Sequence, residues 1–303
     1  MLRIFKSGSP INQMQTTQLT SDDSTPATFT FADQTQVRSH GLRARLSTLR
    51  LPIGLVLPVA ATAIWEVASR AGWVAPHLLP APSALLDTLV GLAADGSLVK
   101  HIGISSARVA AGFAIGASTG LALGSATALN ARLNRLLDPS LQALRAVPSL
   151  AWVPLLLLWL GIDIAPKLTL IAIGTFFPMY LATAAGLRDV DRKLVEVGQQ
   201  LGLTPRALLL KIYLPAALPA LFTGLRASLG LGWMFLVAAE LIAATSGLGY
   251  LLTDGRETGR ADLVLVAIIT LAILGKASDA VLVAIERRAL VWRDVADPQR
   301  AAQ

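Results

Sequence analysis

The sequence predicts an all-α polytopic membrane protein with six transmembrane helices. Of its 303 residues, 54% are hydrophobic and 15% are charged, whereas soluble proteins carry about 25% charged residues. The mean hydropathy is +0.60, and several stretches long enough to cross a bilayer contain no Asp, Glu, Lys or Arg. The excess of Lys and Arg, 26 against 19 Asp and Glu, gathers in alternate connecting segments. These observations together favour membrane-spanning helices over a soluble core.

The uncharged or nearly uncharged stretches give the expected bounds of the spans. We expect them at about 49–67, 109–129, 141–160, 168–186, 225–245 and 263–285. The stretch 71–86 is equally apolar, but Pro76, Pro80 and Pro82 remove amide donors and break any helix, so it predicts a loop at the outer interface. The whole membrane domain is expected to cover 49–290.

Charged residues near or inside the spans are expected to form pairs. Glu66 and Arg70 are four residues apart at the end of the first span, and Lys276 and Asp279 are three apart within the sixth. Both spacings place the two side chains on one helix face. A pair within each helix is therefore predicted.

The Lys and Arg residues also give the orientation. Seventeen fall on the side that holds both termini and four on the other, so both termini are expected to be cytoplasmic. Because the positive charges follow loop parity and do not form one patch, nucleic acid is not an expected partner. Residues 1–48 are polar and lack a signal-peptide core, which predicts a disordered cytoplasmic tail, and 291–303 form a short C-terminal tail.

The second and later spans contain residues that shape helix packing. Four glycines at four-residue spacing, Gly112, Gly116, Gly120 and Gly124, line one face of the second span. They allow another backbone to approach closely, although a pore-lining role is the alternative. Three prolines in or beside the third and fourth spans predict helix bending, namely Pro148, Pro154 and Pro178.

The segment 187–220, between the fourth and fifth spans, has unusually clear helix punctuation. A helix is expected from about Asp191 to Leu201, ending at Gly202, a residue suited to a left-handed C-cap. Thr204 and Pro205 then predict the start of a second short helix, 206–213, which Pro215 and Pro219 are expected to end. Two short helices at a sharp corner form a rigid protrusion, more than a simple connection requires.

This segment resembles the cytoplasmic EAA loop of ABC-importer permeases, whose pattern is E-A-A-x3-G-x9-I-x-L-P. The matching residues are Glu196, Gly198, Gly202, Ile212, Leu214 and Pro215. The sequence departs from the pattern at Val197 and Gly198, where the family has two alanines. The resemblance implies that this loop contains a coupling helix that sits in a groove of a separate ATPase subunit.

The resemblance extends from about residue 50 to 294. Over this range the sequence is similar to the permeases of the aliphatic sulfonate, taurine and nitrate import group. The landmarks include His101, Ser105-Ser106-x-Arg108, Leu137-Asp138-Pro139, Trp159-Leu160-Gly161-Ile162-Asp163, Gly224-Leu225-Arg226 and Gly247-Leu248-Gly249-Tyr250. It implies the type I ABC importer fold in a bacterial inner membrane. It also implies a second permease copy, two ATPase subunits and a periplasmic substrate-binding protein. The implied substrate is a small organic anion, with aliphatic sulfonates first and taurine, nitrate or a small heterocycle as alternatives.

Three residues are candidates for the translocation path or its gate: Glu240, Arg145 and Trp233. Glu240 lies inside the fifth span, where an unpaired charge is costly, so it either faces the path or has a structural partner. A carboxylate would repel an anionic substrate, which favours a gate over a binding role. Arg145 either attracts an anion or extends its charge to the membrane interface.

The sequence offers no chemistry of its own. There are no cysteines, and His40, His77 and His101 lie far apart, so no metal site is expected. There is no G-x4-G-K-[ST] phosphate loop. We therefore expect a non-enzymatic subunit without a cofactor, with ATP bound by its partner. An ion-coupled secondary transporter and a membrane enzyme are the other classes considered. Neither class explains the two capped short helices expected in the loop 187–220.

Overall fold

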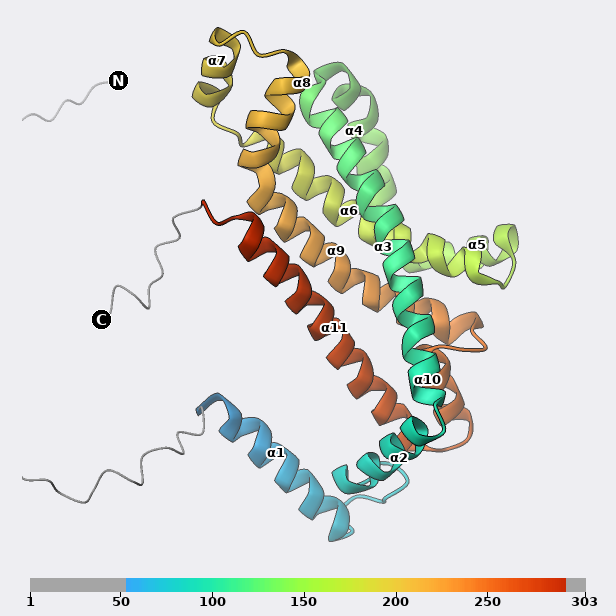
Figure 1. Ribbon diagram of the computed structural model, residues 1–303. Helices are drawn as coiled ribbons and strands as arrows, with labels where there is room; N and C mark the ends of the chain where they lie inside the picture. The colour runs from blue at the N-terminus through green and yellow to red at the C-terminus, as the bar shows by residue number, and fades with distance from the viewer. Residues whose placement is uncertain (1–52, 293–303) are drawn as a thin grey trace, which may run out of the picture. The chain divides into compact units, whose positions relative to one another are not determined.

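The computed structural model describes residues 53–292, and all regular elements in that range are helical (Figure 1). The predicted tails, 1–48 and 291–303, lie outside the described residues except for positions 291 and 292. The helices, in chain order, are α1 (Ile53–Arg70), α2 (Pro82–Ala94), α3 (Ser97–Leu129), α4 (Ala131–Ala146), η1 (Ser149–Trp152), α5 (Val153–Leu160), α6 (Ile164–Arg188), α7 (Arg192–Gln200), α8 (Pro205–Leu208), η2 (Leu209–Tyr213), α9 (Leu214–Ala243), α10 (Leu248–Glu257) and α11 (Ala261–Ala289).

Four helical segments in the described range are long and apolar enough to cross a membrane. They are α3, α6, the run Pro205–Ile242 and α11, and the bent pair of α4 with Ser149–Leu160 makes a fifth if it counts as one span. The expected first span corresponds to α1, an 18-residue helix at the edge of the described range. The count of six spans stays a prediction.

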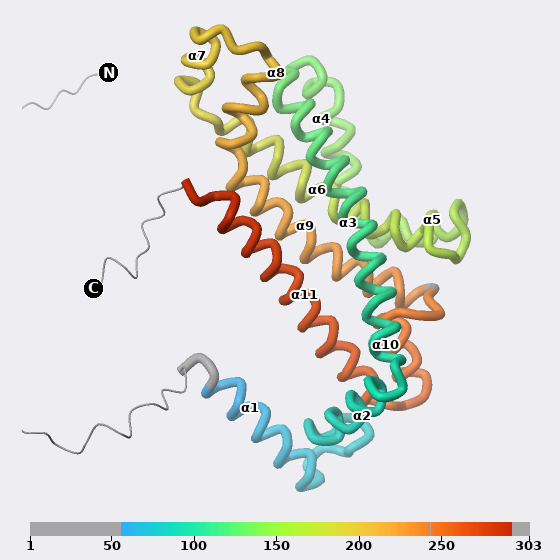
Figure 2. The backbone as a smooth tube through the Cα atoms, viewed as in Figure 1, coloured from blue at the N-terminus to red at the C-terminus, as the bar shows by residue number. Residues whose placement is uncertain are grey.

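Three helices, α3, α6 and α9, form the centre of the described bundle, with α6 between the other two (Figure 2). Their shared core includes Val109, Ile171 and Leu236, one from each helix, which are 2%, 0% and 0% exposed. Because lipid is as apolar as these side chains, close packing rather than burial from water holds such helices together.

The glycine row of α3 faces α6. A Cβ atom on Gly112 would lie 2.6 Å from the Ile171 side chain, and one on Gly120 would lie 2.7 Å from the Phe176 carbonyl oxygen. Gly116 and Gly124 meet α6 in the same way, at Ala172 and at Thr183. All four glycines therefore let the two backbones approach to a distance that no side chain would permit.

The segment between the first two spans is more helical than the sequence analysis expected. Residues 71–81 form the predicted loop, but α2 begins at Pro82, where a proline suits the first helical turn. The carboxylate of Glu66 accepts hydrogen bonds from the Ser83 amide and hydroxyl, at 3.1 and 2.8 Å, and so caps α2. Long-range capping of this kind leaves no local sequence signal.

The second span begins twelve residues earlier than its expected start at 109. Hydrogen bonds from the side chain and then the amide of Ser97 lower the pKa of the Asp95 carboxyl. The hydrogen bond from the amide, at 2.8 Å, also stabilises the first turn of α3. The expected start at 109 followed from the charge of Arg108, which precedes the uncharged stretch. In the structure Arg108 lies inside the helix, where it has a buried partner.

The third expected span, 141–160, is not one helix. α4 ends at Ala146, and the chain turns through 86° between α4 and the segment Ser149–Leu160. Pro148 precedes η1, and Pro154 lies in the first turn of α5. Each proline lacks an amide donor, which agrees with the predicted bending, although the bend is sharp enough to break the helix.

The expected end of the second short helix in the segment 187–220 is wrong. Residues 205–242 form one helical run, in which η2 is a π-helical segment just before α9. Pro215 lies in the first turn of α9, and Pro219 is also inside that helix. The wider π turn immediately precedes Pro215 and changes the hydrogen-bond pattern there, so the helical run continues through this proline.

The two expected pairs have different outcomes. Arg70 and Glu66 form the predicted ion pair, with Nε and Oε1 2.6 Å apart. Asp279 instead pairs with Arg226 of α9, whose Nε and Nη2 atoms donate to its two oxygens at 2.8 and 3.3 Å. The planar guanidinium satisfies both carboxylate oxygens at once, which the ammonium of Lys276 does not.

Candidate functional site

The segment 187–220 forms a protrusion at one end of the bundle, beyond α6 and α9 (Figure 1). The Asp191 side chain caps α7 by accepting from the Lys193 amide at 2.9 Å. α7 ends before Gly202, whose φ of +72° is a backbone conformation that favours glycine. Thr204 then caps α8 by accepting from the Ala207 amide at 3.3 Å. The left-handed backbone at Gly202 and the N-cap at Thr204 agree with the sequence prediction.

Gly198 and Ile212, two residues of the loop pattern, are in contact across the corner. A Cβ atom on Gly198 would collide with the end of the Ile212 side chain and lie 2.7 Å from that of Leu208. The Gly198 carbonyl also accepts from the Leu203 amide at 3.1 Å. A small residue at 198 is therefore required for α7 to pack on the segment 208–212.

The base of the protrusion joins the core of the bundle. Leu214 packs against a buried cluster that includes Met179 and Leu221, and Pro215 is half-buried beside it. The protrusion therefore has apolar contacts both within itself and with the helices below it. The protrusion is thus joined to the bundle by these contacts and by the helical run that leads into α9.

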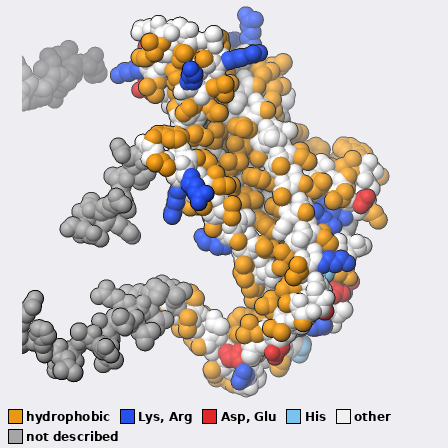
Figure 3. All heavy atoms as spheres, viewed as in Figure 1, with side chains coloured by type: hydrophobic (Ala, Val, Ile, Leu, Met, Phe, Trp, Pro, Cys, Tyr) orange, Lys and Arg blue, Asp and Glu red, His pale blue; other side chains and the backbone are white. Residues whose placement is uncertain are grey.

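The outer face of α7 is exposed and carries apolar side chains. Leu194, Val197 and Leu201 are 52%, 54% and 74% exposed, and their spacing places them on one face of the helix. Glu196 is also exposed. Figure 3 shows hydrophobic side chains next to Lys and Arg side chains at this end of the molecule. Such a mixture is typical of a protein-binding surface.

At the other end of α9, Glu240 lies in a buried network of polar groups. Its side chain pairs with Arg108 of α3, with Oε1 and Nη1 2.6 Å apart, and its residue is 1% exposed. The Ser105 hydroxyl is 2.9 Å from both carboxylate oxygens. Arg108 also donates to the Ser246 carbonyl at 2.7 Å. The carboxylate is thus enclosed by an arginine and a serine of α3, so its charge is paired and hydrogen-bonded inside the bundle.

The same network holds the start of α10. Gly249 donates its amide to Glu240 at 2.8 Å, Leu248 donates to Ser105 at 2.8 Å, and Gly247 donates to Nδ1 of His101 at 2.9 Å. Three amides that a helix N-terminus leaves without internal partners are thereby satisfied. Gly247 has a φ of +115°, and its Cα faces the Glu240 carboxylate closely. The network therefore ties α3, α9 and α10 together.

His101, Ser105 and Arg108 are family landmarks to which the sequence alone gives no role. These residues are four and three positions apart, so they form a polar stripe on one face of a helix. That stripe was the feature of the sequence that could have indicated a polar network at this end of α3. The partner, Glu240, is 132 residues from Arg108 and could be found only from the fold.

The other two candidate path residues lie apart from this network. Arg145 is exposed in the last turn of α4. Trp233 is half-buried and donates its indole N–H to Ser278 of α11 at 2.9 Å, so it connects α9 with α11. In the described residues, no group of three His, Asp or Glu side chains gathers as a metal site would require.

Residues 116–291 match the family described as Binding-protein-dependent transport system inner membrane component. The match covers more than half of the chain and includes α7, Gly202 and Glu240. The chain belongs to this family.

Members named for their transport roles are similar over most of this permease. The aliphatic sulfonates transport permease protein of Escherichia coli (strain K12) is 45% identical over 78% of this chain and 90% of the relative. The protein of the same name in Bacillus subtilis (strain 168) is 43% identical over 80% and 87%. The taurine transport system permease protein of Escherichia coli (strain K12) is 36% identical over 80% and 89%.

A solved structure supports the fold of the permease. The MetNI methionine ABC transporter, in an inward-facing conformation, has a chain that matches with a TM-score of 0.58 at 20% identity. The match covers 64% of this chain and 96% of that chain. The expected type I importer fold is confirmed.

Proposed function

We propose that this permease carries a small organic anion, an aliphatic sulfonate, across the bacterial inner membrane as a subunit of an ABC importer. The observation that carries the proposal is the 45% identity to an aliphatic sulfonates permease across 90% of its length. The taurine permease, at 36% identity, keeps taurine as the alternative substrate. Nitrate and a small heterocycle remain weaker alternatives because they rest on group resemblance alone.

The outer face of α7 is the proposed docking surface for an ATPase subunit. Its apolar side chains are more than half exposed in the described part of the chain, and the acidic Glu196 beside them offers a charge for the partner. We infer that two permease copies bind two ATPase subunits and receive substrate from a periplasmic binding protein. In this arrangement ATP is bound and hydrolysed by the partner, and this chain needs no cofactor.

The orientation follows from the docking surface. An ATPase subunit works in the cytoplasm, so the protrusion 187–220 must be cytoplasmic, and the Glu240 network must lie near the outer face. The Lys and Arg distribution in the sequence supports the same orientation. Both termini are then cytoplasmic.

The continuous helical run 205–242 suggests how ATP hydrolysis reaches the outer end. This run has 38 residues, which gives a length of about 57 Å at the helical rise. Its first turn belongs to the docking protrusion, and its last turn carries Glu240. When the ATPase pair closes, α8 and α9 move as one lever, and the Glu240–Arg108 pair transfers this movement to α3 and α10.

An ion-coupled secondary transporter is the second class, and the Glu240 network argues against it. A proton-coupled transporter needs an ionisable side chain within the membrane that exchanges its proton during transport. Glu240 instead has an arginine, a serine and a backbone amide as partners. Arg226 and Asp279 also form a bidentate pair.

Growth tests the proposed substrate. A strain that lacks this gene and redundant importers should fail to grow with ethanesulfonate as its only sulfur source, and the wild-type gene should restore growth. Growth on sulfate should be equal in both strains. Unchanged growth on ethanesulfonate after deletion would reject the sulfonate assignment, and a defect confined to taurine would favour the alternative.

A further inference from the structure

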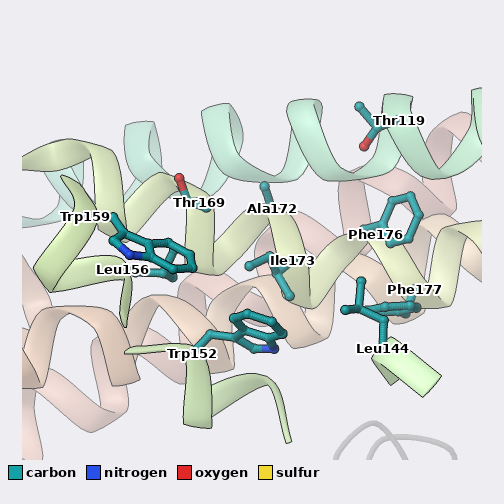
Figure 4. A pocket seen from close by; sticks show the side chains of 10 residues that line it. All are labelled: Thr119, Leu144, Trp152, Leu156, Trp159, Thr169, Ala172, Ile173, Phe176 and Phe177. Atoms are coloured by element: carbon teal, nitrogen blue, oxygen red, sulfur yellow. The ribbon is translucent and has the colours of Figure 1, made fainter. Parts of the chain in front are cut away.

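An apolar cavity of about 370 Å³ lies at the sharp bend between α4 and α5. Its walls come from α3, α4, η1, α5 and α6, and Figure 4 shows the side chains around it. Trp152 and Trp159 line one side, and Phe176 and Phe177 of α6 lie at the other end. Its volume lies within the range of about 300–1,000 Å³ that is usual for small-molecule sites.

The walls of this cavity suit hydrocarbon and not a charged group. None of its lining residues is charged. The two hydroxyls in the lining, on Thr119 and Thr169, already donate to backbone carbonyls of their own helices at 2.8 and 2.9 Å. An oxyanion inside the cavity would find no charged partner, and only the indole N–H groups of Trp152 and Trp159 as donors besides these hydroxyls. It would therefore lose more hydrogen bonds to water than it could regain, which is unfavourable.

The cavity is also placed where a transported molecule could reach it. It lies at the 86° bend between α4 and the segment Ser149–Leu160, where α5 packs against α6. Trp159 is 65% exposed and extends from the cavity wall to the surface of α5. The wall is thus continuous with a surface outside the packed core, so a ligand can enter without unfolding any element.

We propose that this cavity binds the hydrocarbon chain of the organic anion during its passage, while the charged end stays at the mouth. This inference rests on the proposed function and adds a preference for the length of the substrate's hydrocarbon chain. A bare oxyanion such as sulfate has no carbon chain to place there, so the cavity favours substrates with a longer chain. The permease then contributes to substrate selection instead of leaving it to the binding protein.

Uptake of two linear sulfonates tests this assignment. The complete importer, with its ATPase subunits and binding protein, is reconstituted in vesicles, and ATP-driven uptake of ethanesulfonate and hexanesulfonate is measured. Ile173→Phe fills the cavity, and Leu144→Ala enlarges it. Ile115→Phe is the matched control, because Ile115 is 51% exposed on α3 and does not line the cavity.

We expect Ile173→Phe to reduce the hexanesulfonate-to-ethanesulfonate uptake ratio about tenfold, since one methylene in an apolar pocket can change discrimination by that factor. Leu144→Ala should raise the ratio, and Ile115→Phe should leave it unchanged. Because the binding protein is the same throughout, its own preference cancels in the comparison. Retained ethanesulfonate uptake shows that the variant has folded and assembled.

Three results would overturn the assignment. Equal loss of both substrates in both cavity variants would mean that the cavity packs against a second copy of the chain or a lipid. An unchanged ratio in both variants would mean that the hydrocarbon chain does not enter. Wild-type uptake of neither sulfonate would instead reject the proposed substrate class, and with it the role of the cavity.

Discussion

At the scale of single residues, the buried carboxylate of Glu240 connects the helices at one end of the bundle. Glu240 is 1% exposed, and the side chain of its partner Arg108 is 10% exposed. Removal of one partner from such a pair leaves the other charge buried and unpaired, which costs more than the pair itself contributes. Removal of both partners avoids that cost.

We therefore expect Glu240→Gln to destabilise the purified permease by about 3–5 kcal/mol. The double variant Arg108→Gln with Glu240→Gln should recover part of this loss, as a double-mutant cycle would measure. The thermal unfolding midpoint in detergent is the readout. Glu257→Gln is the control, because the Glu257 side chain is 67% exposed, and it should leave the midpoint unchanged. A midpoint unaffected by Glu240→Gln would show that the network does not hold the three helices.

At the scale of elements, the contact between α3 and α6 depends on the absence of side chains. A Cβ atom on Gly120 would lie 2.7 Å from the Phe176 carbonyl oxygen and 3.0 Å from the Met179 Cβ. Backbone atoms cannot move aside as a flexible side chain does. The two helices must then separate or shift along each other.

Gly120→Ala should accordingly destabilise the protein by about 1–3 kcal/mol, the usual cost of overpacking. Gly103→Ala is the matched control on the same helix, where an added Cβ meets nothing within 4 Å. It should stabilise α3 by up to about 1 kcal/mol, because alanine favours helix more than glycine does. Monodisperse yield and the unfolding midpoint measure both variants. Equal behaviour of the two would contradict the account of the glycine row.

The elements also show which features a sequence reveals. The caps of α7 and α8, the glycine row and the loop at 71–81 were predictable because each depends on residues that are close in sequence. The start of α3, the position of α10 and the Arg226–Asp279 pair were not, because each depends on residues brought together by the fold. Prolines were informative at Pro148 and misleading at Pro215, since a π turn before α9 accommodates the second.

At the scale of the whole molecule, the orientation in the membrane is the first point to test. The chain contains no cysteine, so a thiol reagent can label only a cysteine that is introduced by substitution. Gln199 on α7 and Thr258 after α10 are both exposed, and they lie near opposite ends of the run 205–242.

A membrane-impermeant maleimide added to intact spheroplasts should label Thr258→Cys and not Gln199→Cys. After the membrane is permeabilised, both variants should react equally, which controls for intrinsic accessibility. The reverse pattern would place α7 outside the cytoplasm and would exclude it as the docking surface for an ATPase.

The central claim is that a partner ATPase drives transport by binding α7, and ATP-driven uptake of ethanesulfonate into vesicles tests it most directly. Uptake should require the permease, the ATPase subunits, the binding protein and ATP together. Leu201→Arg, which places a charge on the exposed face of α7, should abolish both uptake and co-purification of the ATPase. Leu78→Arg should retain both, because Leu78 is 67% exposed in the loop at the opposite end. Ethanesulfonate uptake by the permease alone, driven by an ion gradient, would contradict the account.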